Sequence, residues 1–201
     1  MTEALLPPPG RHEAARGDVR PTVHALFFGV QPTAAAGARM FAVGRDLQDR
    51  FDLGGQVTPV RRQHVSLCGF HAGLEPPSRE IIGLARAIGE TIRFRPFDVA
   101  FNEAVSWSPR SNTPHLVLRC SNEHGDWGLI ESRRLFAMAF RERGLRLKAA
   151  FEPHLTLLHG RKAAPATDIA PIRWAVGELV LIHSHQGLGR HDVVGRWPLA
   201  R

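Results

Sequence analysis

The sequence has few cysteines and no long apolar segment. Cys68 and Cys120 are the only two cysteines, and they are not spaced as CxxC. This usage argues against a disulfide scaffold and a thiolate zinc site. No apolar run of roughly 20 residues occurs, and the N-terminus lacks a positive segment followed by an apolar one. We therefore expect a soluble, cytoplasmic protein with free thiols and no membrane partner.

Motifs of the common nucleotide-dependent and hydrolytic enzymes are also missing. The chain contains no P-loop, dinucleotide fingerprint, nucleophile elbow or HExxH sequence. His183, His185 and His191 lie close together in the sequence, as in some metal sites, but no acidic or cysteine ligand set is evident beside them. The sequence therefore predicts no metal and no cofactor.

Lysine is nearly absent, so arginine carries the positive charge. Lys148 and Lys162 are the only lysines among 26 basic residues, and the formal net charge is +7. The guanidinium fork of arginine suits phosphate oxygens better than a point charge does. This balance favours a nucleic-acid or nucleotide partner. It is equally typical of a chain whose arginines reflect coding bias and only solvate the surface.

Hydrophobic periodicity predicts the elements of the first half of the chain. Residues 1–20 have little apolar content and predict a flexible tail, and residues 21–201 predict a single bilobal domain. The patterns indicate a strand over 23–30, a helix over 32–51, a strand over 59–70 and a helix over 78–92.

The second half mixes strands and helices less regularly. Strands are predicted over 94–101 and 104–107 around a turn at 102–103, and over 115–120, before a helix over 126–143. A polar loop is predicted through 171, followed by strands over 174–182 and 189–197. Since helices do not alternate strictly with strands, a doubly wound parallel sheet is disfavoured. The predicted class is α+β, with antiparallel sheets and helices packed outside.

One short pattern occurs once in each half of the chain. Residues 64–67 (HVSL) and 154–157 (HLTL) both place a histidine two positions before a hydroxyl residue, with apolar residues between and after. Side chains of a strand alternate between its two faces, so the histidine and the hydroxyl share one face while the apolar residues seal a core. Along the strand the imidazole and the hydroxyl lie about 6–7 Å apart.

Two such pairs fit phosphodiester cleavage without a metal. One group must take a proton from the attacking oxygen, another must give a proton to the departing oxygen, and imidazole does either at neutral pH. A nearby hydroxyl can donate to a phosphoryl oxygen. His64 and His154 are therefore candidate catalytic residues, with Ser66 and Thr156 as phosphate ligands. The alternative is that each histidine is buried with a satisfied hydrogen bond, which a matched pair disfavours.

The paired motifs resemble those of the two-histidine (2H) phosphoesterases, and within them the LigT-like RNA 2′,3′-cyclic phosphodiesterases, also called 2′-5′ RNA ligases. The resemblance covers most of 23–199 and includes LFF at 26–28, PHLTLL at 153–158 and RWPL at 196–199. It implies a bilobal α+β fold in which two antiparallel β-sheets form a V-shaped central cleft. It also implies hydrolysis of a 2′,3′-cyclic phosphate to a 2′-phosphate, with His154 as base and His64 as acid.

The chain departs from the family pattern after each motif. The family typically has an aromatic residue one position before Phe70, so Phe70 is either a base-stacking residue or part of the core. His159 occupies a position where the family often has a phosphate-contacting arginine, and Arg161 follows two residues later. Either His159 or Arg161 is expected to contact phosphate. The implied partners are RNA ends or nucleotides with a 2′,3′-cyclic phosphate, and no protein partner is inferred.

Two other functions are compatible with the same residues. The arginine excess and the unmatched positions fit a non-catalytic RNA-binding module on the same fold. A 2H enzyme that acts on a different cyclic or 2′-5′ phosphodiester fits the motifs as well.

Overall fold

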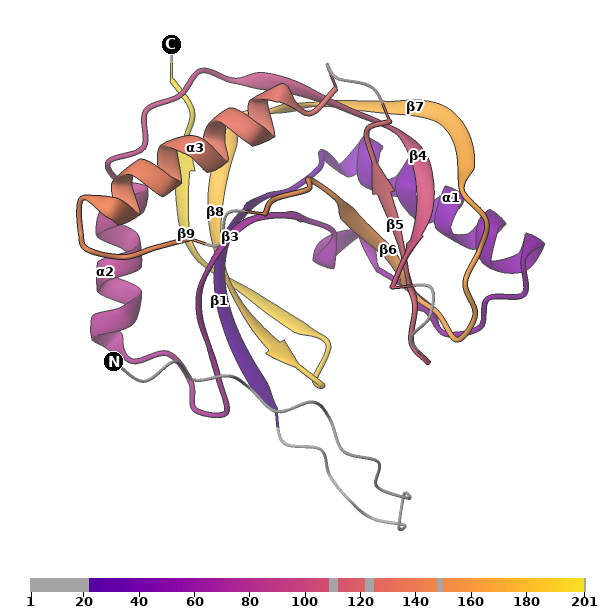
Figure 1. Cartoon of the computed structure of the whole chain (residues 1–201), viewed down its shortest axis with the longest axis horizontal. Coiled ribbons are helices and arrows are strands. Elements are labelled where there is room, and N and C mark those ends of the chain that lie inside the picture. The colour runs from indigo at the N-terminus through magenta and orange to yellow at the C-terminus, as the bar shows by residue number, and fades with distance from the viewer. Residues whose placement is uncertain (1–21, 109–111, 122–124, 148–149, 201) are drawn as a thin grey trace.

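The computed structural model describes residues 22–108, 112–121, 125–147 and 150–200. These residues form three α-helices, one short 3-10 helix and nine strands in a single antiparallel sheet (Figure 1). The α+β class predicted from the sequence is confirmed. The tail predicted over 1–20 lies outside the described residues. Among the described residues, no helix has both the length and the apolar character that a bilayer span requires.

The strands follow the order β7-β4-β5-β6-β3-β1-β8-β9, and β2 pairs with β6. Their bounds are β1 (Val23–Val30), β2 (Gln56–Val57), β3 (Val65–Gly73), β4 (Phe97–Trp107), β5 (His115–Arg119), β6 (Leu155–His159), β7 (Thr167–Val176), β8 (Glu178–Gln186) and β9 (Arg190–Pro198).

The sheet consists of two halves that meet at one residue pair. Val65 of β3 pairs with Leu155 of β6, and this pair joins β7-β4-β5-β6 to β3-β1-β8-β9. Val65 and Leu155 are each the first residue of their strand, so in an antiparallel arrangement the two strands run apart from this pair. The two sheets expected from the sequence are thus two halves of one sheet, joined at this seam.

Local sequence signals set the ends of the helices α1 (Ala34–Arg50), α2 (Arg79–Gly89) and α3 (Trp127–Arg141). Thr33 caps α1 by accepting a hydrogen bond from Ala36 N at 3.3 Å, and Ser78 caps α2 by accepting one from Ile81 N at 3.3 Å. Gly144 follows α3 with φ +72°, a left-handed conformation that suits glycine. The predicted helices are confirmed apart from terminal residues.

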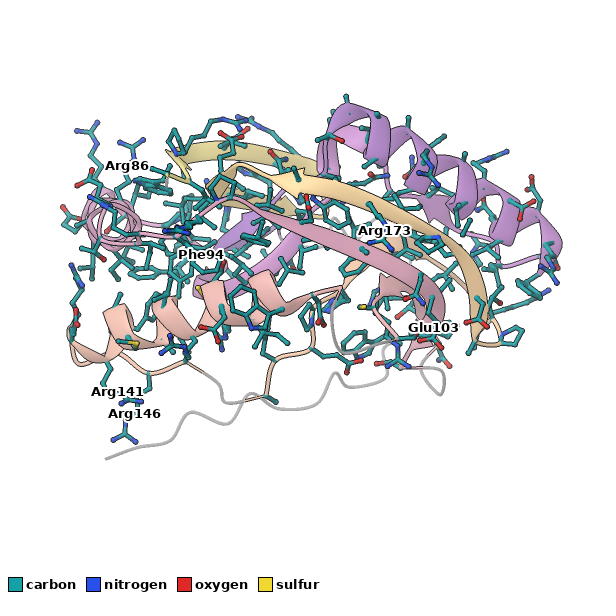
Figure 2. All side chains as sticks on the ribbon, turned by 90° about the horizontal axis from the view of Figure 1, so that it is seen from above. Arg86, Phe94, Glu103, Arg141, Arg146 and Arg173 are labelled. Atoms are coloured by element: carbon teal, nitrogen blue, oxygen red, sulfur yellow. The ribbon has the colours of Figure 1, made fainter. Side chains whose placement is uncertain are left out.

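One hydrophobic core joins the two halves of the sheet. It contains Phe28 of β1 from one half and Phe101 of β4 from the other, both fully buried. Helix α1 packs on β6 and β7, and α2 packs on β8 and β9. Helix α3 packs on both β3 and β4, and its Phe136 ring lies 4.4 Å from the Phe28 ring. Figure 2, seen from above, shows the strands lying between α1 and α3.

Four predictions about strands are wrong. The strand predicted over 59–70 begins only at Val65, because Val60–Arg62 form the 3-10 helix η1. The turn predicted at 102–103 is an irregularity inside the continuous strand β4, where the Asn102 side chain bonds both the backbone N–H and the hydroxyl of Ser121. The polar loop predicted through 171 contains the start of β7. The strand predicted over 174–182 is the end of β7 and the start of β8, divided at Gly177. Exposed residues along β7 hide its strand pattern from the sequence.

Candidate active site

The seam between the two halves of the sheet brings both histidine motifs to one place. When the register of Val65 and Leu155 is continued by one residue each way, His64 lies beside Thr156 and Ser66 lies beside His154. Val65 and Leu155 are fully buried, so these four neighbours face the other side of the sheet. The two histidines therefore flank the seam on one face, and the charge of His154 acts on His64.

Each catalytic candidate is held by the same backbone interaction. His64 Nδ1 lies 2.8 Å from the Arg62 carbonyl oxygen, and His154 Nδ1 lies 2.9 Å from the Glu152 carbonyl oxygen. A carbonyl oxygen only accepts, so Nδ1 carries a proton in both rings. The other nitrogen, Nε2, is then the one that exchanges a proton with a ligand. The backbone two residues upstream thus sets the tautomer in both motifs.

An aromatic ring supports each of the two imidazoles. Phe27 of β1 lies 4.8 Å from His64 between ring centroids, and Trp107 of β4 lies 4.2 Å from His154. Both contacts are tilted, at 33° and 47°. Such contacts restrict rotation of the imidazole and add to the energy of area burial. The two motifs therefore match in register, in hydrogen bonding and in aromatic support.

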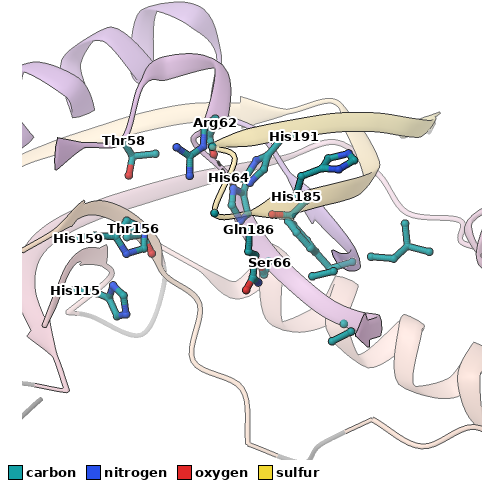
Figure 3. Close-up of a pocket in the computed structure, with 18 of the residues that line it drawn as sticks. Thr58, Arg62, His64, Ser66, His115, Thr156, His159, His185, Gln186 and His191 are labelled. Carbon is teal, nitrogen blue, oxygen red and sulfur yellow. Dashed lines mark hydrogen bonds between the residues drawn. The ribbon is translucent and has the colours of Figure 1, made fainter. Parts of the chain in front are cut away.

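A pocket of about 660 Å³ lies over the seam, within the size range of small-molecule sites. Figure 3 shows Arg62, His64 and His191 on one wall and His115, Thr156 and His159 on the other. None of the described residues that line this pocket is acidic. The lining therefore favours an anionic ligand.

His154 is not among the described residues that line this pocket. Thr156, two residues later, lines the pocket, while the Trp107 ring that contacts His154 lines a smaller and more open depression. Arg119 and Glu152 border the same depression and form an ion pair at 2.8 Å. Since Glu152 also holds the His154 ring through its carbonyl oxygen, this ion pair fixes the segment that carries His154.

Burial and positive neighbours lower the pKa of three imidazoles of the pocket. Burial lowers the pKa of His64 and outweighs the hydrogen bond to the Arg62 carbonyl, which raises it, while the charges of His154 and Arg62 lower it further. Burial also lowers the pKa of His191 to about 4, and the charges of His64 and Arg62 add to the effect. The pKa of His159 is lowered by burial and by the charges of His115 and Arg62. An anion in the pocket would offset this repulsion.

Four residues of the pocket carry a buried polar atom without a hydrogen-bond partner in the described part of the chain. The atoms are Thr58 Oγ1, Arg62 Nε, His115 Nδ1 and His191 Nδ1. Buried polar groups are normally satisfied, by protein, water or a ligand. Their concentration in one pocket indicates a site built for a polar ligand with several hydrogen-bond acceptors or donors.

The residues predicted from the sequence divide into three groups. His64, Ser66, Thr156 and His159 line the pocket, whereas His154 is not among its lining residues and contacts Trp107 beside it. Phe70 does not line it: its ring lies 5.5 Å from the Phe140 ring between centroids and packs against the core, which fits the second of the two roles expected for it. Arg161 is exposed and its stem lies against Gly54, so of the two phosphate candidates His159 is the one in the pocket.

Sequence reasoning missed Thr58, Arg62, His115 and His191 as pocket residues. Arg62 comes from η1 (Val60–Arg62) immediately before the first motif, so its place next to His64 was a usable signal. His191 reaches the site because β9 pairs with β8, which places it beside Ser184 on the pocket face, 5.1 Å from the His64 ring. No local pattern indicates that pairing.

No protein-family model matches the chain, and no curated protein matches it. Solved structures do. E. coli LigT in complex with 3′-AMP is 23% identical, with a TM-score of 0.66 over 89% of this chain and 99% of LigT. The chain has a LigT-like fold. TT0787 of Thermus thermophilus is 19% identical, with a TM-score of 0.67 over 87% of this chain and 97% of that one.

The LigT-like fold extends to more distant proteins. Usb1 of Kluyveromyces marxianus matches 88% of this chain and 98% of its own length at 9% identity, with a TM-score of 0.51. The resemblance to the 2H phosphoesterases noted from the two motifs is therefore confirmed at the level of the fold. In this LigT-like fold the seam pair, Val65 of the first motif and Leu155 of the second, lies at the centre of the sheet order.

Proposed function

We propose that this protein is a metal-independent phosphodiesterase that hydrolyses the 2′,3′-cyclic phosphate of RNA ends or nucleotides to a 2′-phosphate. One observation carries the proposal: His64 and His154 each immediately precede a residue of the seam pair, and each has Nδ1 bound to a backbone carbonyl, which leaves Nε2 for proton transfer. An acid and a base on either side of one phosphorus atom are what this reaction requires.

The reaction divides between the two motifs. The cyclic phosphate lies over the seam, where the hydroxyls of Ser66 and Thr156 donate to its non-bridging oxygens. One imidazole takes a proton from water as the oxygen of that water bonds to phosphorus. The other imidazole gives a proton to the 3′ oxygen as its bond to phosphorus breaks. The 2′ oxygen keeps the phosphate, and the two histidines exchange protonation states, which solvent restores.

The lowered pKa of His64 favours this histidine as the base. Burial, with the charges of His154 and Arg62, leaves the His64 ring unprotonated at neutral pH and ready to accept a proton from water. His154 is then the acid that protonates the leaving oxygen. This assignment reverses the one expected from the sequence, in which His154 was the base.

The size and lining of the pocket support a nucleotide as the substrate. LigT has been crystallised with 3′-AMP, phosphate, ATP and NADP+, all of them phosphate or adenine nucleotides. Arg62 supplies a fixed positive charge beside His64, and His159 and His115 lie on the facing wall with rings 4.5 Å apart. We infer that Arg62 contacts the phosphate and that the wall formed by His159 and His115 contacts the rest of the nucleotide.

Turnover of a 2′,3′-cyclic nucleotide in excess EDTA tests the proposal. The wild type is expected to hydrolyse it to the 2′-phosphate, and His64→Ala and His154→Ala are each expected to lose about 10²–10⁴-fold in kcat. Circular dichroism melting of each variant serves as the folding control. Full activity of either folded variant would refute the mechanism. Salt-sensitive RNA binding by a wild type without turnover would support a non-catalytic RNA-binding module instead.

A different substrate would leave its own signature in the same experiment. The wild type could instead fail to hydrolyse 2′,3′-cyclic nucleotides but cleave a 2′-5′ linked dinucleotide, with the same dependence on His64 and His154. That result would support the two-histidine mechanism and contradict the substrate assignment.

A further inference from the structure

Three histidines that the proposed reaction does not use meet on the other face of the sheet. His24 belongs to β1, and His183 and His185 belong to the neighbouring strand β8. In the antiparallel register, His24 pairs with His185 and Leu26 pairs with His183. Leu26 is fully buried in the main core, so these histidines continue the core face of the sheet beyond its last apolar residues. We call them the β1–β8 histidine cluster.

The strand alternation separates this cluster from the catalytic pocket. Phe27 and Ser184, which line the pocket, point to the opposite face from His24 and His183. His185 borders the pocket because β8 passes along its wall, but its ring is held on the other face by Asp192. His191, the third histidine of the C-terminal group in the sequence, pairs with Ser184 and faces the pocket instead.

The nitrogen atoms of the cluster are close enough to share one ion. One ring nitrogen from each of the three side chains lies within 4.8 Å of the other two. His24 Nδ1 and His183 Nε2 are 2.9 Å apart, and the rings of His183 and His185 are 4.2 Å apart between centroids. Two nitrogen ligands of a tetrahedral ion lie about 3.3 Å apart when each is about 2.0–2.1 Å from the metal. The His24–His183 pair therefore has to open by a few tenths of an ångström, and the pairs with His185, which lie within 4.8 Å, have to close by about 1.5 Å at most.

The carboxylate of Asp192 binds one histidine of the cluster, as carboxylates often do at metal sites. Asp192 Oδ2 lies 2.9 Å from His185 Nε2, so Nε2 of this ring is the proton donor and Nδ1 keeps the lone pair. A carboxylate that orients a ligating histidine in this way is a recurrent feature of zinc sites. Arg190 binds both oxygens of Asp192 at 2.8 and 2.7 Å and so fixes the carboxylate.

We propose that His24, His183 and His185 bind one divalent transition-metal ion, such as Zn²⁺, through three imidazole nitrogens, with water as the fourth ligand. Imidazole is a good ligand for zinc, copper and nickel, and three histidines with an open position form an established coordination set. On binding, the ring that donates in the His24–His183 contact moves its proton, through solvent, to its other nitrogen, so that both facing nitrogens present lone pairs to the ion. The ion ties the start of β1 to the end of β8.

This site was not expected from the sequence for two reasons. His24 lies far from His183 along the chain, and Asp192 was not identified as a partner of the histidines. The strand register brings both to the cluster and removes His191 from it.

Isothermal titration of the full-length protein with Zn²⁺, after treatment with a chelator, tests the proposal. One equivalent is expected to bind, and His24→Ala, His183→Ala and His185→Ala are each expected to weaken binding by at least about 100-fold. Asp192→Asn is expected to weaken it by about 10–100-fold. His71→Ala removes a histidine outside the cluster and is expected to leave the affinity unchanged.

A second readout keeps the proposal falsifiable if a variant fails to fold. Wild-type protein loaded with Co²⁺ is expected to show the strong visible absorption of a four-coordinate site, and the Tm is expected to rise with Zn²⁺ concentration. Absence of saturable binding of one equivalent by the wild type would overturn the proposal. Loss of binding in His64→Ala, with binding retained in His24→Ala, would place the ion in the catalytic pocket and would also overturn it.

The outcome of the zinc-binding test does not depend on whether the protein has the proposed enzyme activity. Hydrolysis by His64 and His154 is expected to persist in EDTA, whereas zinc binding is scored by heat, absorption and Tm. Either proposal can therefore fail while the other stands.

Discussion

Single side chains at the seam owe their chemistry to backbone and aromatic contacts. His64 and His154 each have Nδ1 bound to the carbonyl two residues upstream and one ring face against an aromatic side chain, Phe27 or Trp107. These contacts orient the free Nε2 atoms. The two sites differ in their electrostatic surroundings, since Arg62 acts on His64.

The activity of the wild type is expected to persist below the ordinary pKa of imidazole. His64 acts as base only when neutral, and burial lowers its pKa below the ordinary value of 6.5. Protonation of His64, and with it the loss of kcat/KM, therefore begins only as the pH falls below that value. A pH profile of kcat/KM, with NMR titration of His64, measures this. An acidic limb centred above this ordinary pKa would contradict the assignment of His64 as base.

Replacing Arg62 is expected to affect both rate and pH dependence. Arg62→Gln removes a positive charge that lowers the pKa of His64, so the acidic limb is expected to move to higher pH. Loss of a phosphate contact is expected to reduce kcat/KM by about 10²–10³-fold. The neighbouring Arg61 is exposed and does not line the pocket, so Arg61→Gln is the matched control. Equal effects of the two substitutions would exclude a specific role for Arg62.

At the scale of elements, two short segments, β2 and η1, position residues on the walls of the pocket. β2 pairs with β6 through Gln56 and His159, and the chain then turns through η1 to reach Arg62. Gly55 precedes β2 with φ +75°, and a Cβ there would overlap the carbonyl oxygen of His159. The close approach of these two backbones therefore depends on glycine.

Opposite effects on stability are expected from two glycine substitutions. Gly55→Ala is expected to destabilise the protein by about 1–3 kcal/mol because it adds both left-handed strain and a steric clash. Gly83 lies exposed within α2 with no atom near its would-be Cβ, so Gly83→Ala is expected to stabilise by about 0.5–1 kcal/mol. Urea unfolding measures both. Equal stability of the two variants would show that the β2 approach is not constrained.

At the scale of the whole molecule, the two halves of the sheet depend on shared packing. The strands cross the seam through the single pair Val65 and Leu155, whereas α3 packs on β3 from one half and β4 from the other. Phe136 of α3 is fully buried against Phe28. The core, more than the hydrogen bonds at the seam, therefore holds the two halves of the sheet together around the pocket.

Phe136→Ala is expected to destabilise the whole molecule at once. Removing a buried phenylalanine lowers the free energy of unfolding by about 3–5 kcal/mol. Because the core is continuous, the lowered transition should remain single, with equal calorimetric and van't Hoff enthalpies. Calorimetry of wild type and variant measures this and also tests the expectation of one domain over 21–201. Two separate transitions in the wild type would show independent lobes.

Much of the architecture was accessible from local sequence. The strand at 23–30 is a continuous apolar run, the three helices have apolar periodicity, and two of them have side-chain caps, Thr33 and Ser78. The α+β class and the two motifs followed from these patterns. Only the end of β7 was predicted as a strand, because its first residues, 167–171, are mostly polar or small and include a proline, and its place in the sheet depends on pairing with β4.

The sequence by itself determined which chemistry is available: two imidazole–hydroxyl pairs on strands whose apolar residues must face a core. Only the tertiary structure decided where these groups meet, through the register of Val65 against Leu155, and which further residues join them. The strand pairing places His191 in the pocket and His183 on the opposite face, near His24. The physical reason is that side-chain alternation is local, whereas strand register is set by contacts between distant segments.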